Sequence, residues 1–261
     1  MTAYPSDLTD REWEIISEMI PQAKKGGRPR SVNIRSIVNA IFYVLENGIK
    51  WRSLPHDYPA WETVYWYFKV WAEDGTIVRI HKKLRQITRV TAGKKPEETV
   101  AIIDSQSTRT TEEASIKGFD AGKKTKGRKR HIAVDTMGLL VEVLIHSAGI
   151  QDRDGGRFLF SKAKTNGATF TKSYADGGYA GKLIDWAKLT WDIDLEIVKR
   201  SDQKKFVVLP KRWIVERTLS WLNRYRRLAK DFERFGKTVR NWIFLAMTRL
   251  MLKRLGKQYA S

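Results

Sequence analysis

The amino-acid sequence predicts an α/β protein, in which a mixed five-stranded sheet with flanking helices follows an all-helical N-terminal region. Two observations lead to this prediction. Up to about residue 92, apolar residues recur at helical spacing. Beyond the segment 91–98, which we take as a linker, short apolar runs of strand length alternate with helical patterns. Three strands followed by helix, strand, helix, strand and further helices indicate a mixed α/β layer arrangement.

Four helices are predicted in the N-terminal region. The first begins after Thr9, a suitable N-cap, and the second ends at Asn47 and Gly48, a typical stop signal. Gly75 separates the third helix from the fourth. The third helix has a regular apolar face, made by Trp61, Val64, Tyr65, Phe68, Trp71 and Ala72.

The second region contains the strands of the predicted sheet. The expected strands are residues 100–103, 129–135, 139–147, 168–175 and 195–198, of which the second and third form a hairpin. The expected helices are residues 153–164, 180–190, 211–231 and 238–255.

Composition excludes several classes of protein. The chain has 261 residues, of which 42% are hydrophobic, so it can bury a core and is not predominantly disordered. No stretch reaches the roughly 20 apolar residues of a membrane span, and the N-terminus lacks a secretion-signal pattern. The absence of cysteine excludes disulfides, thiolate zinc sites and cysteine nucleophiles. We therefore expect an intracellular, cytoplasmic protein.

The net charge is strongly positive. Lys and Arg number 49 against 29 Asp and Glu, which gives a charge of +20. Such an excess is typical of a protein that binds a polyanion, and we expect nucleic acid as the partner. An alternative with the same composition is a ribosomal or RNA-coating protein.

Three acidic residues are candidates for metal-dependent chemistry. Asp104 ends a buried strand, Asp176 ends another immediately before two glycines, and Glu216 lies in a helix whose same face carries Arg212. A carboxylate at the end of a buried strand is costly unless it is paired or binds metal, and hard oxygen ligands suit Mg²⁺ or Mn²⁺. Alternatively, the aspartates form caps or turns and Glu216 belongs to a solvated salt-bridge stripe.

Two segments are candidates for DNA contact. The glycine-containing loop 117–130 is expected to bind phosphates through Lys117, Lys123, Lys124, Lys126, Arg128, Lys129 and Arg130. The alternative is a disordered, solvated loop. A helix-turn-helix interpretation places Thr63, Trp66 and Lys69 in the major groove, although Trp66 could equally pack on another subunit.

Several motifs together resemble one family. They are residues 100–109 (VAIIDSQSTR), 118–124 (GFDAGKK), 127–135 (GRKRHIAVD), 150–154 (IQDRD), 175–181 (ADGGYAG) and 212–218 (RWIVERT). In order and spacing these resemble the DDE transposases of bacterial insertion sequences, of the insertion-sequence-five type. The similarity extends over nearly the whole chain, including the segment 51–55 (WRSLP).

The resemblance implies a ribonuclease-H-like catalytic domain at 93–261, preceded by a helical DNA-binding domain at 1–92. It implies that Asp104, Asp176 and Glu216 bind Mg²⁺ or Mn²⁺. Arg212 fits the family's arginine on the Glu helix, whereas Leu209 and Asn223 stand where the wider group has tyrosine and lysine. Arg224 or Arg227 could replace the lysine in orienting phosphates.

The function that the resemblance implies is cleavage of double-stranded DNA at the terminal inverted repeats of an element, with transfer of the 3′-hydroxyl ends into target DNA. Because two element ends must be joined together, we expect a homodimer or a larger assembly associated with the bacterial nucleoid. The alternatives are a non-catalytic DNA-binding regulator derived from a transposase and a structural RNA-binding protein.

Overall fold

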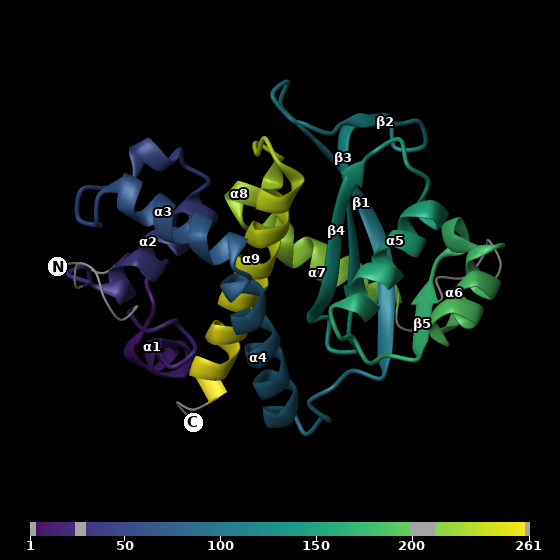
Figure 1. Ribbon diagram of the computed structural model, residues 1–261, viewed down its shortest axis with the longest axis horizontal. Coiled ribbons are helices and arrows are strands. Elements are labelled where there is room, and N and C mark those ends of the chain that lie inside the picture. The colour runs from purple at the N-terminus through teal and green to yellow at the C-terminus, as the bar shows by residue number, and fades with distance from the viewer. Residues whose placement is uncertain (1–3, 24–29, 199–211, 259–261) are drawn as a thin grey trace. The chain divides into compact units, whose positions relative to one another are not determined.

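The computed structural model describes residues 4–23, 30–198 and 212–258, which form two compact units (Figure 1). The first unit takes in the described residues up to Thr88, together with 224–229 and those from Asn241 onward. The second comprises Arg89–Asn223 and Lys230–Arg240. A single cut at residue 92 therefore does not separate the compact units, and the functional division at that point stays a prediction.

The first unit is helical, and the four predicted N-terminal helices are present. The Thr9 hydroxyl oxygen accepts a hydrogen bond from the Glu12 amide, and the Glu12 carboxylate accepts one from the Thr9 amide, which closes a capping box. Gly48, at φ 69°, ends the second helix in the left-handed conformation. The helices that contribute to this unit are α1 (Asp10–Ser17), α2 (Ile34–Asn47), η1 (Trp51–Ser53), α3 (Trp61–Glu73), α4 (Thr76–Thr91), α8 (Arg226–Ala229) and α9 (Gly236–Gln258).

The C-terminal part of α9 belongs to the core of the first unit. The ring of Trp242 stacks on Phe68, with the centroids 4.4 Å apart, and lies 5.6 Å from Trp51. The buried guanidinium of Arg249 pairs with Glu12 at 2.8 Å. These contacts join residues more than 170 positions apart, so the sequence pattern of α9 alone could not assign it to this unit.

In the part of the chain that the structure describes, the second unit is built on a six-stranded mixed sheet. Along the sheet the order is β4–β3–β1–β5–β6, with β3 antiparallel to β1 and β4, and with β5 parallel to β1 and β6. The three-residue strand β2 pairs with the start of β3. The strands are β1 (Val100–Arg109), β2 (Gly118–Asp120), β3 (Thr125–Val134), β4 (Leu140–Ser147), β5 (Lys172–Ala175) and β6 (Asp194–Ile197).

All five predicted strands are present, and β2 is an addition. The first and second predicted strands extend further than their apolar runs, because β1 and β3 pair continuously from Ile102 opposite Val134 to Arg109 opposite Gly127. The additional residues are held in the strands by hydrogen bonds between backbone groups, which form with polar and apolar side chains alike. A polar lysine-rich segment such as 117–130 therefore folds largely as strand.

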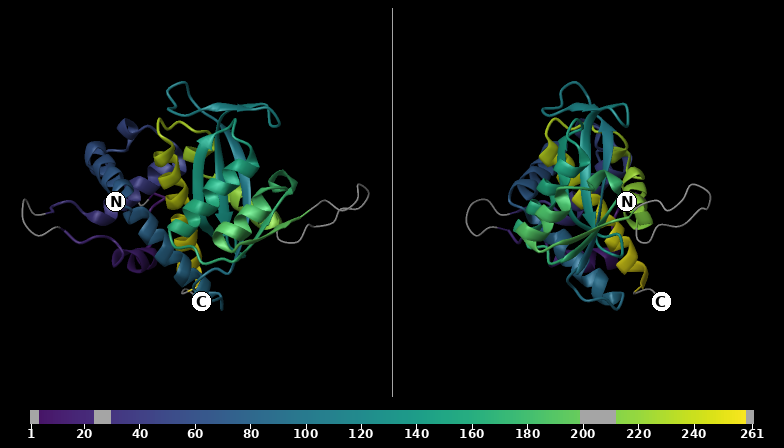
Figure 2. Two further views of the ribbon diagram at one scale, coloured as in Figure 1. Left: turned by 45° about the vertical axis from the view of Figure 1, so that its right-hand side comes forward. Right: turned by 90° about the vertical axis from the view of Figure 1, so that its right-hand side faces the viewer.

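Helices cover both faces of this sheet (Figure 2). The helix α5 (Asp152–Thr165) packs on β4, β3 and β1, with α6 (Leu183–Trp191) beside it, and α7 (Arg212–Asn223) packs on the opposite face against β1 and β3. This architecture is ribonuclease-H-like, as expected. Among the described helices, none combines the length and apolar character that crossing a bilayer requires.

The predicted helix 211–231 is divided in two. Its first part is α7 in the second unit, and its last part is α8 in the first unit. Between them the buried Tyr225 donates its hydroxyl proton to the Ala246 carbonyl at 3.0 Å. This contact with α9 holds Tyr225 at the break between α7 and α8, whereas the helical pattern of the sequence alone predicted one continuous helix.

Gly127 is a sensitive position of the sheet. A Cβ on Gly127 would lie 2.0 Å from the Thr108 carbonyl oxygen, so the neighbouring β1 backbone would have to move. We expect Gly127→Ala to lower the free energy of unfolding by about 1–3 kcal/mol, measured by urea denaturation. At the control position Gly122 the nearest atom would lie 3.6 Å away, on Asp120. Equal destabilisation by Gly122→Ala would contradict this explanation.

Candidate active site

Asp104 and Asp176 come from neighbouring parallel strands. Ile102 of β1 lies opposite Tyr174 of β5. Asp104, two residues further along β1, and Asp176, directly after the end of β5, therefore stand at the same level. Adjacent strands are about 4.8 Å apart, which brings the two aspartates side by side at the carboxyl end of β5. Asp176 also caps the short helix η2 (Gly177–Tyr179) by accepting the Gly178 amide proton at 2.8 Å.

Arg212 links two of the three acids. Its Nη2 lies 3.5 Å from Oδ2 of Asp176, and its Nε lies 3.2 Å from Oε1 of Glu216, one helical turn along α7. The apolar flank of α7, formed by Val215, Leu219 and Leu222, is buried. Glu216 is half-exposed on the polar side of the helix, and the Arg212 guanidinium, which contacts both carboxylates, connects it with Asp176.

Asp104 is the most perturbed acid of this group. Burial raises the pKa of its carboxyl to about 6, and the negative charge of Asp176 acts in the same direction. A hydrogen bond from the Ser105 amide, at 2.7 Å, and the charges of Lys123 and Arg212 oppose the increase. Burial therefore disfavours the charged form of Asp104, and additional positive charge at this point would stabilise its carboxylate.

The donor set fits a hard divalent cation. Carboxylate oxygens are the ligands that Mg²⁺ and Mn²⁺ prefer, and the Arg212 guanidinium already stands as a cation between Asp176 and Glu216. Over residues 4–23, 30–198 and 212–258, no three His, Asp or Glu side chains are grouped as a formed metal site. The three acids therefore supply suitable ligands, while Glu216 is engaged by Arg212.

Asp152 is a further acid at this site for which the sequence indicated no role. Its Oδ1 accepts the Ser105 hydroxyl proton at 2.7 Å and pairs with the Lys129 ammonium at 2.8 Å. A Cβ on Gly178 would lie 3.1 Å from Asp176 Oδ1 and 3.7 Å from Asp152 Oδ2, so the two aspartates are near neighbours. Burial raises the pKa of Asp152, but the hydrogen bonds from Lys129 and Ser105 bring it below the ordinary value. In the sequence, only its position at the start of a helix that follows a strand could have indicated that Asp152 belongs to this site.

A buried polar chain lies beneath the aspartates. The Tyr179 oxygen is 2.6 Å from Nε2 of His131, and Nδ1 of His131 is 3.2 Å from Nε2 of His146. Burial lowers the pKa of His131 to about 3, so the ring is neutral at physiological pH. This chain ties η2, which Asp176 caps, to β3 and β4 and thereby supports the position of Asp176.

The predicted phosphate ligands of the segment 117–130 divide into two groups. Lys117, Lys124 and Lys126 are exposed. Lys123 is exposed in part, but its ammonium donates to the Ser105 carbonyl at 2.9 Å and so turns towards the acids. A second group, on β3, is buried and does not face solvent: Arg128, Lys129 and Arg130.

The expectation that this buried group binds DNA phosphates is corrected by its contacts. Arg128 is fully buried, pairs with Asp231 at 3.1 Å and donates to the Ile116 carbonyl at 2.8 Å. Lys129 is held by Asp152 and by the Ile150 carbonyl. Consecutive residues of β3 point to opposite faces of the sheet, and because both faces are covered all three side chains are buried, where the run of like charges suggested a solvated surface.

The predicted contacts on the helices are reached by solvent to different degrees. On α3, Trp66 is 56% exposed, Lys69 is exposed and Thr63 is half-buried. Arg224 is exposed as well. By contrast, Arg227 donates to the Ile49 carbonyl at 2.7 Å and lies over the Trp242 ring, so its guanidinium is engaged within the first unit.

Two positions of the Glu helix bear on the pattern of the wider group. Asn223 accepts a hydrogen bond from the Gln106 side chain at 3.4 Å, at the end of α7. Leu209 lies outside the described residues. Which residues take the roles of the tyrosine and the lysine of the wider group therefore stays a prediction.

The sheet order and the helices on both its faces define a ribonuclease-H-like protein. Asp176 follows the end of β5 as expected, whereas Asp104 lies midway along β1, because backbone pairing with β3 extends that strand to Arg109. Residues 95–251 match the family described as "Transposase DDE domain", and residues 8–81 match the family described as "Putative transposase of IS4/5 family". The chain belongs to the DDE transposases of IS4/5 type, which confirms the resemblance seen in the sequence.

One relative is itself without an assigned function. The chain is 26% identical to the uncharacterized protein y4sN of Sinorhizobium fredii over 111 residues, which cover 34% of this chain and 89% of the relative. This similarity contributes no residue role.

Proposed function

We propose that this transposase binds the terminal inverted repeats of its insertion sequence, cleaves the DNA at the element ends and transfers the 3′-hydroxyl ends into target DNA. The observation that supports the proposal best is the position of Asp176, which lies beside Asp104 in the β1–β5 register and is joined to Glu216 by the Arg212 guanidinium. DDE transposases use divalent metal ions, and these carboxylates are the ligands that we propose for Mg²⁺ or Mn²⁺.

The protein's own residues would share the remaining tasks. When bound, the metal would polarise the scissile phosphate and activate the attacking oxygen, and so no side chain is needed as a nucleophile. Asp104 and Asp176 are held at one level by the β1–β5 register and by the Gly178 amide. Lys123 brings a positive charge to the same edge, where it would balance the charge of a DNA phosphate.

DNA would be held by surfaces outside the acidic centre. The exposed Lys117, Lys124 and Lys126 are the proposed phosphate contacts, and the exposed side chains of α3, Trp66 and Lys69, are the proposed reading surface for the inverted repeat. Joining two ends calls for a homodimer or a larger assembly. The site of action would be the cytoplasm, at the nucleoid.

A strand-transfer assay tests this proposal. The substrate is a labelled duplex that carries the DNA flanking the gene, mixed with a supercoiled target plasmid. With Mg²⁺ we expect 3′-hydroxyl nicks at the element end and labelled joint molecules, and with EDTA neither product. Specific duplex binding without nicking would favour the non-catalytic regulator instead, and preference for RNA over the duplex would favour a structural RNA-binding protein.

A further inference from the structure

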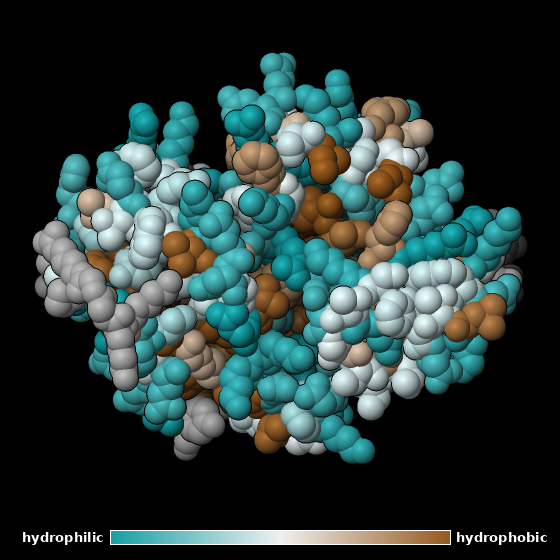
Figure 3. Space-filling model, viewed as in Figure 1, coloured by the Kyte–Doolittle hydropathy of each residue, from teal (hydrophilic) through white to brown (hydrophobic). Residues whose placement is uncertain are grey.

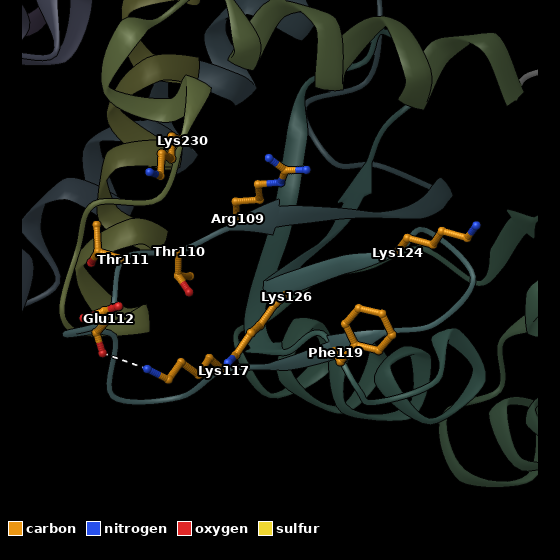
Figure 4. A pocket seen from close by; sticks show the side chains of 9 residues that line it. All are labelled: Arg109, Thr110, Thr111, Glu112, Lys117, Phe119, Lys124, Lys126 and Lys230. Atoms are coloured by element: carbon orange, nitrogen blue, oxygen red, sulfur yellow. Dashed lines mark hydrogen bonds between the residues drawn. The ribbon is translucent and has the colours of Figure 1, made fainter.

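A basic pocket opens on the second unit at the C-terminal end of β1 (Figure 4). Its volume is about 410 Å³, which is within the range of small-ligand sites. Five of its nine lining residues are cations, against one acid, Glu112. The cations are Arg109, Lys117, Lys124, Lys126 and Lys230.

The pocket also has an exposed aromatic wall. The side chain of Phe119 is 59% exposed, and in the β2–β3 ladder it lies opposite Lys126 (Figure 4). Other exposed large apolar side chains of the same unit include Ile116, Phe232 and Phe235, each about half exposed. Hydrophobic atoms accordingly interrupt the hydrophilic surface over β2 and β3 (Figure 3). An exposed apolar patch with a polar rim is typical of a surface that binds a ligand or a partner.

The pocket is pre-organised by its backbone. Gly118 and Gly127 face each other across the ladder, and a Cβ on either would come within about 2 Å of a neighbouring oxygen (2.1 Å and 2.0 Å). The buried Asp120 accepts the Ser107 hydroxyl proton at 2.5 Å and the Lys123 amide proton at 3.0 Å, which fixes the turn after β2. Lys117 donates to the Glu112 carbonyl at 2.7 Å. The backbone of the β2–β3 hairpin, which carries Phe119, is thus held in one conformation.

We propose that this pocket binds an unpaired segment of DNA, with a base stacked on Phe119 and the adjoining phosphates on the surrounding cations. Stacking on an aromatic side chain requires a base whose face is free, and within a duplex both faces are covered by neighbouring base pairs. A concave site with one exposed ring and many cations therefore favours a single strand. A flat cationic face would suit a duplex, because it offers charge to both backbones.

The position of the pocket connects it with the acidic centre. Both lie on β1, and the five residues from Asp104 to Arg109 span about 17 Å at the rise of a strand. That distance corresponds to about five base pairs of duplex at the rise of ~3.4 Å per base pair, so nucleotides in the pocket would lie within a few positions of the cut. The inference thus rests on the proposed function, and it specifies which part of the substrate is held: a few unpaired nucleotides near the cut.

Fluorescence anisotropy tests the inference without any chemistry. The probes are a labelled oligothymidine of about 15 nucleotides and a blunt duplex of equal length, titrated with the full-length protein in EDTA. We expect Phe119→Ala to weaken oligothymidine binding by about 5- to 100-fold and duplex binding by less than about twofold. Phe119→Trp should retain the single-strand affinity, since it keeps the stacking surface. Phe158→Ala removes a ring of α5 that is equally exposed, at 58%, and should change neither affinity.

Three results would overturn the inference: an unchanged oligothymidine affinity in Phe119→Ala, equal weakening for both probes, or an affinity in Phe119→Trp as low as in Phe119→Ala. The proposed function fails separately, in the strand-transfer assay. Cleavage that depends on metal, together with single-strand binding that does not depend on Phe119, would refute only the pocket assignment. Single-strand binding that depends on Phe119, in a protein that never cleaves, would refute only the proposed chemistry.

Discussion

Replacing Asp104 by Asn is expected to abolish DNA cleavage while leaving DNA binding intact. The substitution keeps the shape of the side chain but removes one negative charge from the pair that Asp104 forms with Asp176, where we propose that the metal binds. Loss of a carboxylate ligand removes several kcal/mol of transition-state stabilisation, so the cleavage rate should fall by about a thousandfold or more. Single-turnover cleavage of an element-end duplex in Mg²⁺ measures the effect.

Two comparisons make this result specific. Asp185→Asn removes an exposed carboxylate from α6 and should leave the cleavage rate within about twofold. Duplex affinity in EDTA should be equal or slightly higher in Asp104→Asn, because a negative charge has been removed from a surface that approaches phosphates. Cleavage by Asp104→Asn at the wild-type rate would refute the assignment of this residue to the metal.

The second large effect concerns the stability of the second unit. Arg128→Met is expected to lower the free energy of unfolding by about 3–5 kcal/mol, because Asp231 would remain buried without its ionic partner. Burial already raises the pKa of Asp231, which shows how much its carboxylate depends on the guanidinium. The substitution also leaves the Ile116 and Glu233 carbonyls without their donor. Urea denaturation followed by tryptophan fluorescence measures the change.

Lys126→Met is the matched control, since it makes the same kind of change at an exposed position two residues earlier on β3. It should alter the free energy of unfolding by less than about 0.5 kcal/mol. If Arg128→Met fell within the same range, the ion pair would not be a main support of this unit, and Arg128 would become available again as a candidate DNA contact.

Local patterns predicted most of the secondary structure. The helical period from Trp61 onward and the stop at Asn47 and Gly48 are properties of neighbouring residues, and the structure has helices that match them. The apolar runs of the sheet were recognisable for the same reason. The buried flank of α7 follows helical spacing in the same way, because 3.6 residues per turn fix which side chains share a face.

Other features depended on pairing between distant segments. The strand β2 has three residues in a polar segment, and its partner on β3 supplies its hydrogen bonds. The sequence presented Lys129 and Arg130 as members of a charged loop, whereas the sheet buries them. Asp152 gained its place beside Asp176 only through the packing of α5 on the sheet.

By itself the sequence determined the family, the α/β class and the three acids on which the proposed chemistry depends, because motifs and periodicity are local properties of the chain. Only the tertiary structure decided that Asp104 and Asp176 stand at one level and that Arg212 joins Asp176 to Glu216. It also decided which cations remain exposed and that Phe119 shares a pocket with five of them. Strand register and burial set these relations, and both arise from contacts between residues far apart in the chain.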